Sequence, residues 1–123
     1  VAPRSDLTAT LERQLGAGQR IVDFASEAAP HALAALAPMV TAAAQSGDGV
    51  AVAIMARGAA RLGDVVVAMG WTPGLALMLT GGLAPTYAPY LGAPLRDALA
   101  EPKGEPIDGA LELAGGFARG AAA

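Results

Sequence analysis

The sequence predicts an α+β fold that is mostly helical, with its helices arranged around a very small parallel sheet. Hydrophobic residues make up 54% of the 123 residues, and alanine, a strong helix former, is the commonest of them. Apolar residues recur at helical spacing between 16 glycines and 9 prolines, which divide the chain into short elements. One apolar run, Leu75 to Leu79, is bounded by such breakers and is typical of a strand buried on both faces. A chain of this length is expected to form a single domain, residues 1–123.

Two short helices are predicted first, at 5–15 and 19–28. Ser5 is a good N-cap for the first, and Gly16 ends it. A third helical segment, 30–46, is expected to break near Pro38, because Pro30 and Pro38 each suit the first turn of a helix.

The clearest helix is 48–69, with Asp48 as its N-cap and Gly70 after its end. Arg57, Arg61 and Asp64 lie opposite its apolar residues, and we interpret them as a solvated face. A single apolar stripe is expected to be buried: Ala51, Ile54, Met55, Gly58, Leu62, Val65, Val66 and Met69.

The region after this helix is broken by turn signals. Residues 71–74, Trp-Thr-Pro-Gly, predict a turn before the strand at 75–79, and a short helix broken by Pro85 and Pro89 follows it. Residues 95–100 suit either a second short strand or a frayed helix. A last helix is predicted at 106–118, and its end at 119–123 is expected to fray. One side of this helix is apolar and consists of Ile107, Ala110, Leu111, Ala114 and Phe117.

Composition and charge exclude several classes of partner. The formal net charge is −3 and the basic residues are scattered singly, so no nucleic-acid partner is expected. The apolar stretch 65–84 is interrupted by Gly-Trp-Thr-Pro-Gly, so no membrane partner is expected. The chain has no cysteine, and VAPRSDLTAT at its start has no apolar signal core. A cytoplasmic location fits both observations.

No catalytic or metal-ligating residue is predicted in the chain. His31 is the only histidine, and its place after Pro30 favours an ordinary surface residue. The 11 carboxylates are dispersed, and no phosphate loop of the GxxxxGK[ST] or GxGxxG kind is present. Tyr87 and Tyr90 are three residues apart, but packing in an alanine-rich core is the more usual role for such a pair.

One local pattern indicates ligand binding: Thr80, Gly81, Gly82 and Leu83. Here a predicted buried strand is followed by two glycines and then by a helix. Glycine has no Cβ, so a flat ligand can approach the backbone closely, and the N–H groups at the start of a helix suit ribose oxygens or phosphate. A tight turn is the alternative explanation.

Three blocks of sequence place this pattern in a wider context: ALAPMV…AAAQSGD at 35–48, LTGGLAPTYAPYL at 79–91 and PKGEPIDGALELA at 102–114. In this order they resemble the carboxyl-terminal end of the N-acetylglucosamine/glucosamine kinases of the BadF/BadG/BcrA/BcrD ATPase family. The resemblance covers about residues 7–114. It implies part of a ribonuclease-H-like lobe, of the fold that actin and hexokinase share.

The resemblance also implies a role for each block. The strand, glycine pair and helix would form the adenosine motif, with Gly81 and Gly82 against adenine and ribose and with Thr80 and Leu83 as flanking contacts. The helix that carries Gly109 and Ala110 would pack behind this site. The intact enzyme would use ATP and Mg²⁺ to phosphorylate the 6-hydroxyl of an amino sugar.

The parts of such a kinase that perform catalysis have no counterpart in these residues. The first phosphate loop, the aspartate base and the sugar pocket of the family would lie upstream, so the chain is expected to be a partial domain whose partner is the missing amino-terminal lobe. Its exposed apolar surface would favour a homodimer. Two alternatives are a fragment of a BadF-type activator ATPase and a non-enzymatic helical interaction module. The absence of cysteine disfavours the activator, whose relatives use cysteine-bound iron–sulfur clusters.

Overall fold

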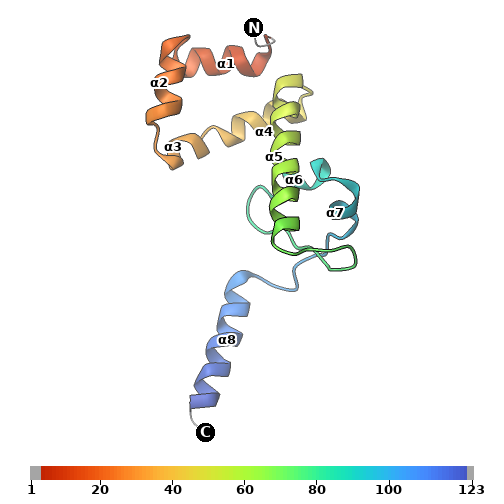
Figure 1. The fold of residues 1–123 in the computed structure, drawn as a ribbon. Coiled ribbons are helices and arrows are strands. Elements are labelled where there is room, and N and C mark those ends of the chain that lie inside the picture. Colours follow the sequence, from red (N-terminus) through yellow and green to blue (C-terminus); the bar gives the residue numbers. More distant parts are fainter. Residues whose placement is uncertain (1–3, 122–123) are drawn as a thin grey trace.

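The computed structural model describes residues 4–121, and helices dominate this range (Figure 1). Helices α4 and α1 lie against the amino-terminal half of the long helix α5, with α2 and α3 farther from it, whereas α6 and α7 lie beside its carboxyl-terminal half (Figure 1). Helix α8 projects away from the rest. The elements are α1 (Asp6–Leu15), α2 (Gln19–Glu27), α3 (Pro30–Ala34), α4 (Ala37–Gln45), α5 (Gly49–Ala68), α6 (Ala84–Tyr87), a 3₁₀ turn η1 (Ala88–Tyr90), α7 (Ala93–Asp97) and α8 (Pro106–Ala121).

The predicted helix starts are confirmed, and side-chain caps explain two of them. The Ser5 hydroxyl accepts a hydrogen bond from the Thr8 N–H at 3.2 Å, and Thr8 Oγ1 accepts one from the Ser5 N–H at 2.8 Å. Asp48 caps α5 by accepting hydrogen bonds from the N–H groups of Val50 and Ala51, both at 3.0 Å. Each cap satisfies amide groups that have no partner within their helix.

The expected break in the third helical segment is also present. It falls at residues 35–36, so that Pro30 begins α3 and Pro38 lies in the first turn of α4. Both prolines therefore occupy positions where the missing N–H costs no helical hydrogen bond.

Two small hydrophobic clusters hold the helices together. The first joins α1, α4 and α5 through Leu7, Ala44, Ala51 and Met55. The second lies between α5 and the segment that follows α6, and it is built from Ala59, Leu91 and Leu95. Tyr87 and Tyr90 pack against both clusters, which confirms the structural interpretation of this pair.

The buried stripe of α5 differs from the predicted one in its second half. Ala51 and Met55 are buried as expected, but Leu62, Val65 and Met69 are 41%, 47% and 82% exposed. The residues buried there are Ala59 and Gly63, because the second cluster packs on the face that carries these small residues. Arg57, Arg61 and Asp64 are exposed, as predicted.

The prediction of a small parallel sheet is wrong for the described residues, which contain no strand. Residues 75–79 form only one isolated parallel bridge, between Leu77 and Leu99. The Leu77 N–H donates to Ala98 O, and the Ala100 N–H donates to Leu77 O, both at 2.8 Å. Leu75 and Met78 are 54% and 52% exposed, so the run is not buried on both faces. It has a pairing partner on one side only, which leaves the other edge and most side chains uncovered.

The segment 95–100 combines the two alternatives left open above. It completes α7 up to Asp97 and then provides Leu99 for the bridge. Within residues 4–121, no helix is both long enough and apolar enough to span a bilayer.

Helix α8 corrects a further expectation. It runs to Ala121 without fraying at Arg119, while residues 122–123 of the predicted frayed end lie outside the described range. Its apolar side does not pack behind the glycine pair, because Ile107, Leu111 and Phe117 are 62%, 63% and 78% exposed. The helix leaves the body at the end of an extended segment (Figure 1).

Candidate functional site

The four residues of the predicted ligand-binding loop, Thr80 to Leu83, are exposed and connect the Leu77 bridge to α6. Gly81 has φ +98°, a left-handed conformation that favours glycine, and no atom lies within 4 Å of where its Cβ would be. Gly82 has no such backbone constraint, and the space around it is also open. The loop is therefore a turn with backbone accessible to a ligand.

The helix start after the glycine pair does not provide the amide donors that the pattern predicted. Helix α6 is a single turn of four residues, Ala84–Tyr87. The Ala84 N–H already donates to Gly81 O at 3.1 Å, and Pro85 has no N–H. The Thr86 N–H donates to Leu83 O. Any backbone contribution to binding thus comes from the loop itself.

The loop faces a second segment across an open groove of about 680 Å³, which we call the loop groove. Thr80 and Gly81 line this groove, whereas Gly82 and Leu83 do not. The structure thus brings the block at 79–91 and the block at 102–114 to one place, although ten residues of chain, 92–101, separate them. The lining residues are Leu79, Thr80, Gly81, Ala84, Pro85, Pro102, Lys103, Gly104, Glu105, Pro106 and Asp108.

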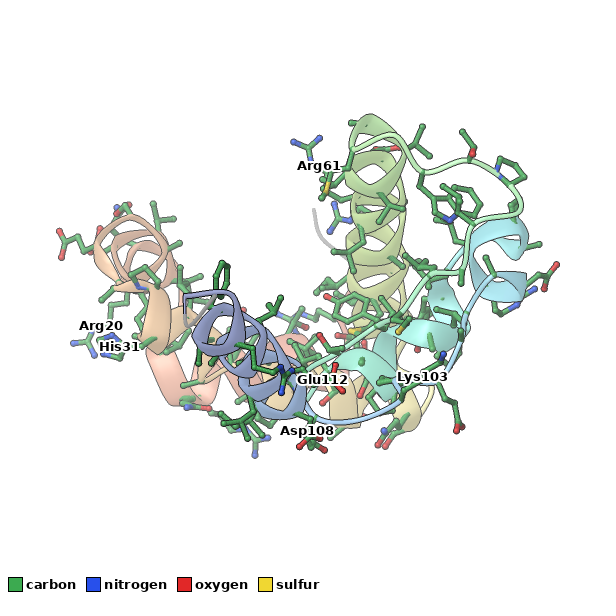
Figure 2. The ribbon with its side chains drawn as sticks, turned by 90° about the horizontal axis from the view of Figure 1, so that it is seen from below. Arg20, His31, Arg61, Lys103, Asp108 and Glu112 are labelled. Atoms are coloured by element: carbon green, nitrogen blue, oxygen red, sulfur yellow. The ribbon has the colours of Figure 1, made fainter. Side chains whose placement is uncertain are left out.

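The charges of the loop groove come from one side, the segment before and at the start of α8. Lys103 is its one cation, and Glu105 and Asp108 are its carboxylates. Figure 2 shows Lys103 and Asp108 on this segment. One positive and two negative charges disfavour a bare polyphosphate. The same carboxylates are good acceptors for hydroxyl groups, such as those of a ribose.

Local hydrogen bonds hold Asp108 in place. Its Oδ2 accepts from the Glu105 N–H at 2.8 Å, which caps the amino terminus of α8 and leaves Oδ1 available. Gly104 allows this turn, because a Cβ there would lie 2.9 Å from Asp108 Oδ2. The start of α8 therefore fixes the position of the Asp108 side chain.

Lys103, Glu105 and Asp108 were not predicted as site residues. The signal that could have found them is the block PKGEPIDG, in which a lysine and two acids surround a glycine and the start of a helix. Only the fold shows that this block faces the glycine loop.

Other candidate chemistry is limited. His31 is exposed, as predicted. Among residues 4–121, no group of three or more histidine, aspartate or glutamate side chains is placed to hold a metal ion. Comparison of the chain with protein-family models, with curated proteins and with solved structures finds no match in any of the three.

Proposed function

We propose that the chain is the nucleotide-binding carboxyl-terminal part of an ATP-dependent amino-sugar kinase, and that the loop groove takes the adenosine end of ATP. One observation supports this proposal above all others. Two of the three blocks that resemble the kinases, 79–91 and 102–114, line the same groove.

The chemistry of the groove fits a nucleoside better than a triphosphate. Gly81 presents backbone without a side chain, against which a flat base can lie. The carboxylates of Glu105 and Asp108 accept hydrogen bonds from ribose hydroxyls, as acidic residues do in other nucleotide sites. In this proposal Lys103, the cation of the groove lining, is the residue assigned to the first phosphate of the nucleotide.

Phosphoryl transfer would need groups that the described residues do not provide. Mg²⁺, a γ-phosphate loop and an aspartate base would come from the amino-terminal lobe, and would position ATP for attack by the sugar 6-hydroxyl. We therefore expect no sugar-dependent ADP release from the 123-residue chain alone.

The proposal can be tested by titrating the ¹⁵N-labelled chain with adenosine, ADP and inorganic phosphate. We expect adenosine to shift the amide signals of 79–85 and 103–108, with a Kd of about 1 mM, or about −4 kcal/mol. Asp108→Asn should weaken adenosine binding by about 1–2 kcal/mol. Arg96→Ala, in α7, is the matched control and should leave binding unchanged. Unchanged signals in the loop groove, or equal shifts with phosphate alone, would contradict the proposal.

The activator ATPase alternative shares the adenosine site, so adenosine binding does not separate it from a kinase. Sugar-dependent ADP release by the intact protein would favour the kinase, and a cysteine-bound iron–sulfur cluster in the intact protein would favour the activator.

The alternative of a helical interaction module is favoured by a different observation, the exposed apolar side of α8. It does not exclude nucleotide binding, because the loop groove and this side of α8 are different surfaces.

A further inference from the structure

Helix α8 is attached to the rest of the molecule mainly through the segment that precedes it. Residues 100–120 are all exposed except Gly115, which is half-buried. Within the described range, neither hydrophobic cluster contains a residue of α8. The hydrogen bond from the Ala100 N–H to Leu77 O is the last backbone bond that ties the described chain to the body before α8. The direction of α8 in Figure 1 is therefore set by residues 101–105.

The backbone of this connecting segment is least restricted at Gly104. Pro102, two residues earlier, has a fixed φ. On the other side the start of α8 is rigid, because Asp108 Oδ2 accepts from the Glu105 N–H at 2.8 Å and the Asp108 N–H donates to Glu105 O at 2.9 Å. Since glycine restricts rotation least, a rotation at Gly104 turns α8 as a unit. Gly104 is thus the hinge between α8 and the body.

The loop groove has one wall on each side of this hinge. Its first wall, 79–85, belongs to the body, because Leu79 packs against the second hydrophobic cluster. Its second wall includes Glu105, Pro106 and Asp108, which turn with α8. In the part of the chain that the structure describes, no hydrogen bond joins the two walls. The width of the groove therefore depends on the direction of α8.

From this arrangement we infer that a nucleoside bound in the loop groove holds α8 in one orientation. The inference rests on the proposed function, in which the base lies against Gly81 and the ribose hydroxyls donate to the carboxylates of the second wall. The ligand makes both sets of contacts only when the two walls face each other at the right width. Because other directions of α8 lose the carboxylate contacts, binding selects one direction from several. The exposed apolar side of α8 is then held at one place relative to the body only while the groove is occupied.

Distances between spin labels test this inference, and the cysteine-free sequence allows labels at chosen positions. Ala118→Cys places one label on α8, and Ala53→Cys places a second on α5, both at exposed residues. Without ligand, pulsed electron paramagnetic resonance should give a broad distribution of distances between the two labels. Adenosine at about 10 mM, about ten times the expected Kd, should reduce the width of this distribution at least about twofold. Inorganic phosphate should not, because it has no flat base to lie against the first wall.

Two controls separate the hinge from other effects. Labels at Ala53→Cys and Asp97→Cys report on the body alone and should give the same narrow distribution with and without adenosine. Gly81→Ala weakens the first wall, so the distances to α8 should stay broad at an adenosine concentration that narrows them in the parent chain. Arg96→Ala, outside the groove lining, is the matched control and should respond as the parent does. Far-UV circular dichroism should not change with adenosine, because α8 is already helical before binding.

Amide titration distinguishes failure of this inference from failure of the proposed function. If adenosine shifts the amide signals of 79–85 and 103–108 while the distances to α8 stay broad, the ligand binds without holding α8. That result overturns the inference and leaves the proposed function standing, whereas unchanged amide signals overturn both. A distribution that is already narrow without ligand, or a gain of helical signal on binding, also overturns the inference, because α8 is then fixed by other contacts or folds instead of turning.

Discussion

The carboxylate of Asp48 accepts a hydrogen bond from the backbone N–H of Leu7 at 3.0 Å, across 41 residues of sequence. Asp48 is also the N-cap of α5, so one side chain serves the amino termini of two helices. The side chain of Leu7 is buried against Ala51 and Met55 at the same junction. This contact fixes where α1 begins relative to the long helix.

Replacing Asp48 should separate its two roles. Asp48→Asn keeps one oxygen for Val50 and Ala51, but its amide nitrogen cannot accept from the Leu7 N–H. Asp48→Ala loses both contacts. We expect the free energy of unfolding to fall in the order wild type, Asn, Ala, as measured by urea denaturation. Asp97→Asn, an exposed acid at the end of α7, should have a smaller effect than either variant.

The same contact predicts a loss of stability in acid. The hydrogen bond from Leu7, followed by that from Ala51, lowers the pKa of Asp48 below its ordinary value of 3.8. A lowered pKa in the folded state stabilises the fold above the unfolded pKa, and this contribution is lost as the pH falls through the folded value. Urea midpoints measured between about pH 5 and pH 2 should therefore fall more for the wild type than for Asp48→Asn. Equal slopes for the two proteins would contradict the assignment.

The Asp48 contacts show what sequence alone can predict here. The cap of α5 was predictable, because a cap is a local pattern of an acid before an apolar helix. The hydrogen bond from Leu7 to Asp48 was not predictable, because nothing in the sequence specifies that a residue 41 positions away packs against this cap. The same distinction explains α5: its length was predicted, but the burial of Ala59 and Gly63 depends on the distant segment that packs on them.

At residues 75–79 the local sequence pattern predicted a buried strand that the described residues do not form. A continuous apolar run indicates burial on both faces only if two neighbours are available to cover it. The described chain offers one such neighbour, at Leu99, and a single bridge forms.

For the candidate site, the sequence indicated Thr80 and Gly81. Lys103, Glu105 and Asp108 could not be predicted, because only the fold brings them to the same groove as Thr80 and Gly81.

Gly58 is the point where α5 meets Tyr87 most closely. A Cβ at Gly58 would lie 2.7 Å from the Tyr87 hydroxyl oxygen and 2.9 Å from Cε1. Gly58→Ala should therefore lower the free energy of unfolding by about 1–2 kcal/mol, despite the better helix propensity of alanine. Tyr87→Phe, which removes the closest atom, should recover part of this loss in the double variant, as thermal unfolding can measure.

A glycine in open space provides the control for this steric argument. Gly109 lies inside α8, and nothing is within 4 Å of its Cβ position. Gly109→Ala should leave the stability unchanged or raise it by up to about 1 kcal/mol. If Gly58→Ala behaves in the same way as Gly109→Ala, the contact with Tyr87 does not constrain the packing of α5.

The glycine pair offers the last prediction, because its two members differ in structure. Gly81 has φ +98° and lines the loop groove, whereas Gly82 has an ordinary backbone and lies outside the lining. Gly81→Ala should cost about 1 kcal/mol of stability through backbone strain. Gly82→Ala should cost little, since nothing is within 4 Å of its Cβ position.

Adenosine binding should show the same asymmetry, if the base lies against the loop as proposed. Gly81→Ala changes the backbone that the base would contact, so the Kd for adenosine should rise about tenfold, or about 1.4 kcal/mol. Gly82→Ala is the matched control and should leave the Kd within about twofold. Amide titrations of the two variants, at a temperature where both are folded, measure this directly. A larger rise in Kd for Gly82→Ala would move the contact to the other face of the turn, and no rise for either variant would leave the glycine pair with a purely conformational role.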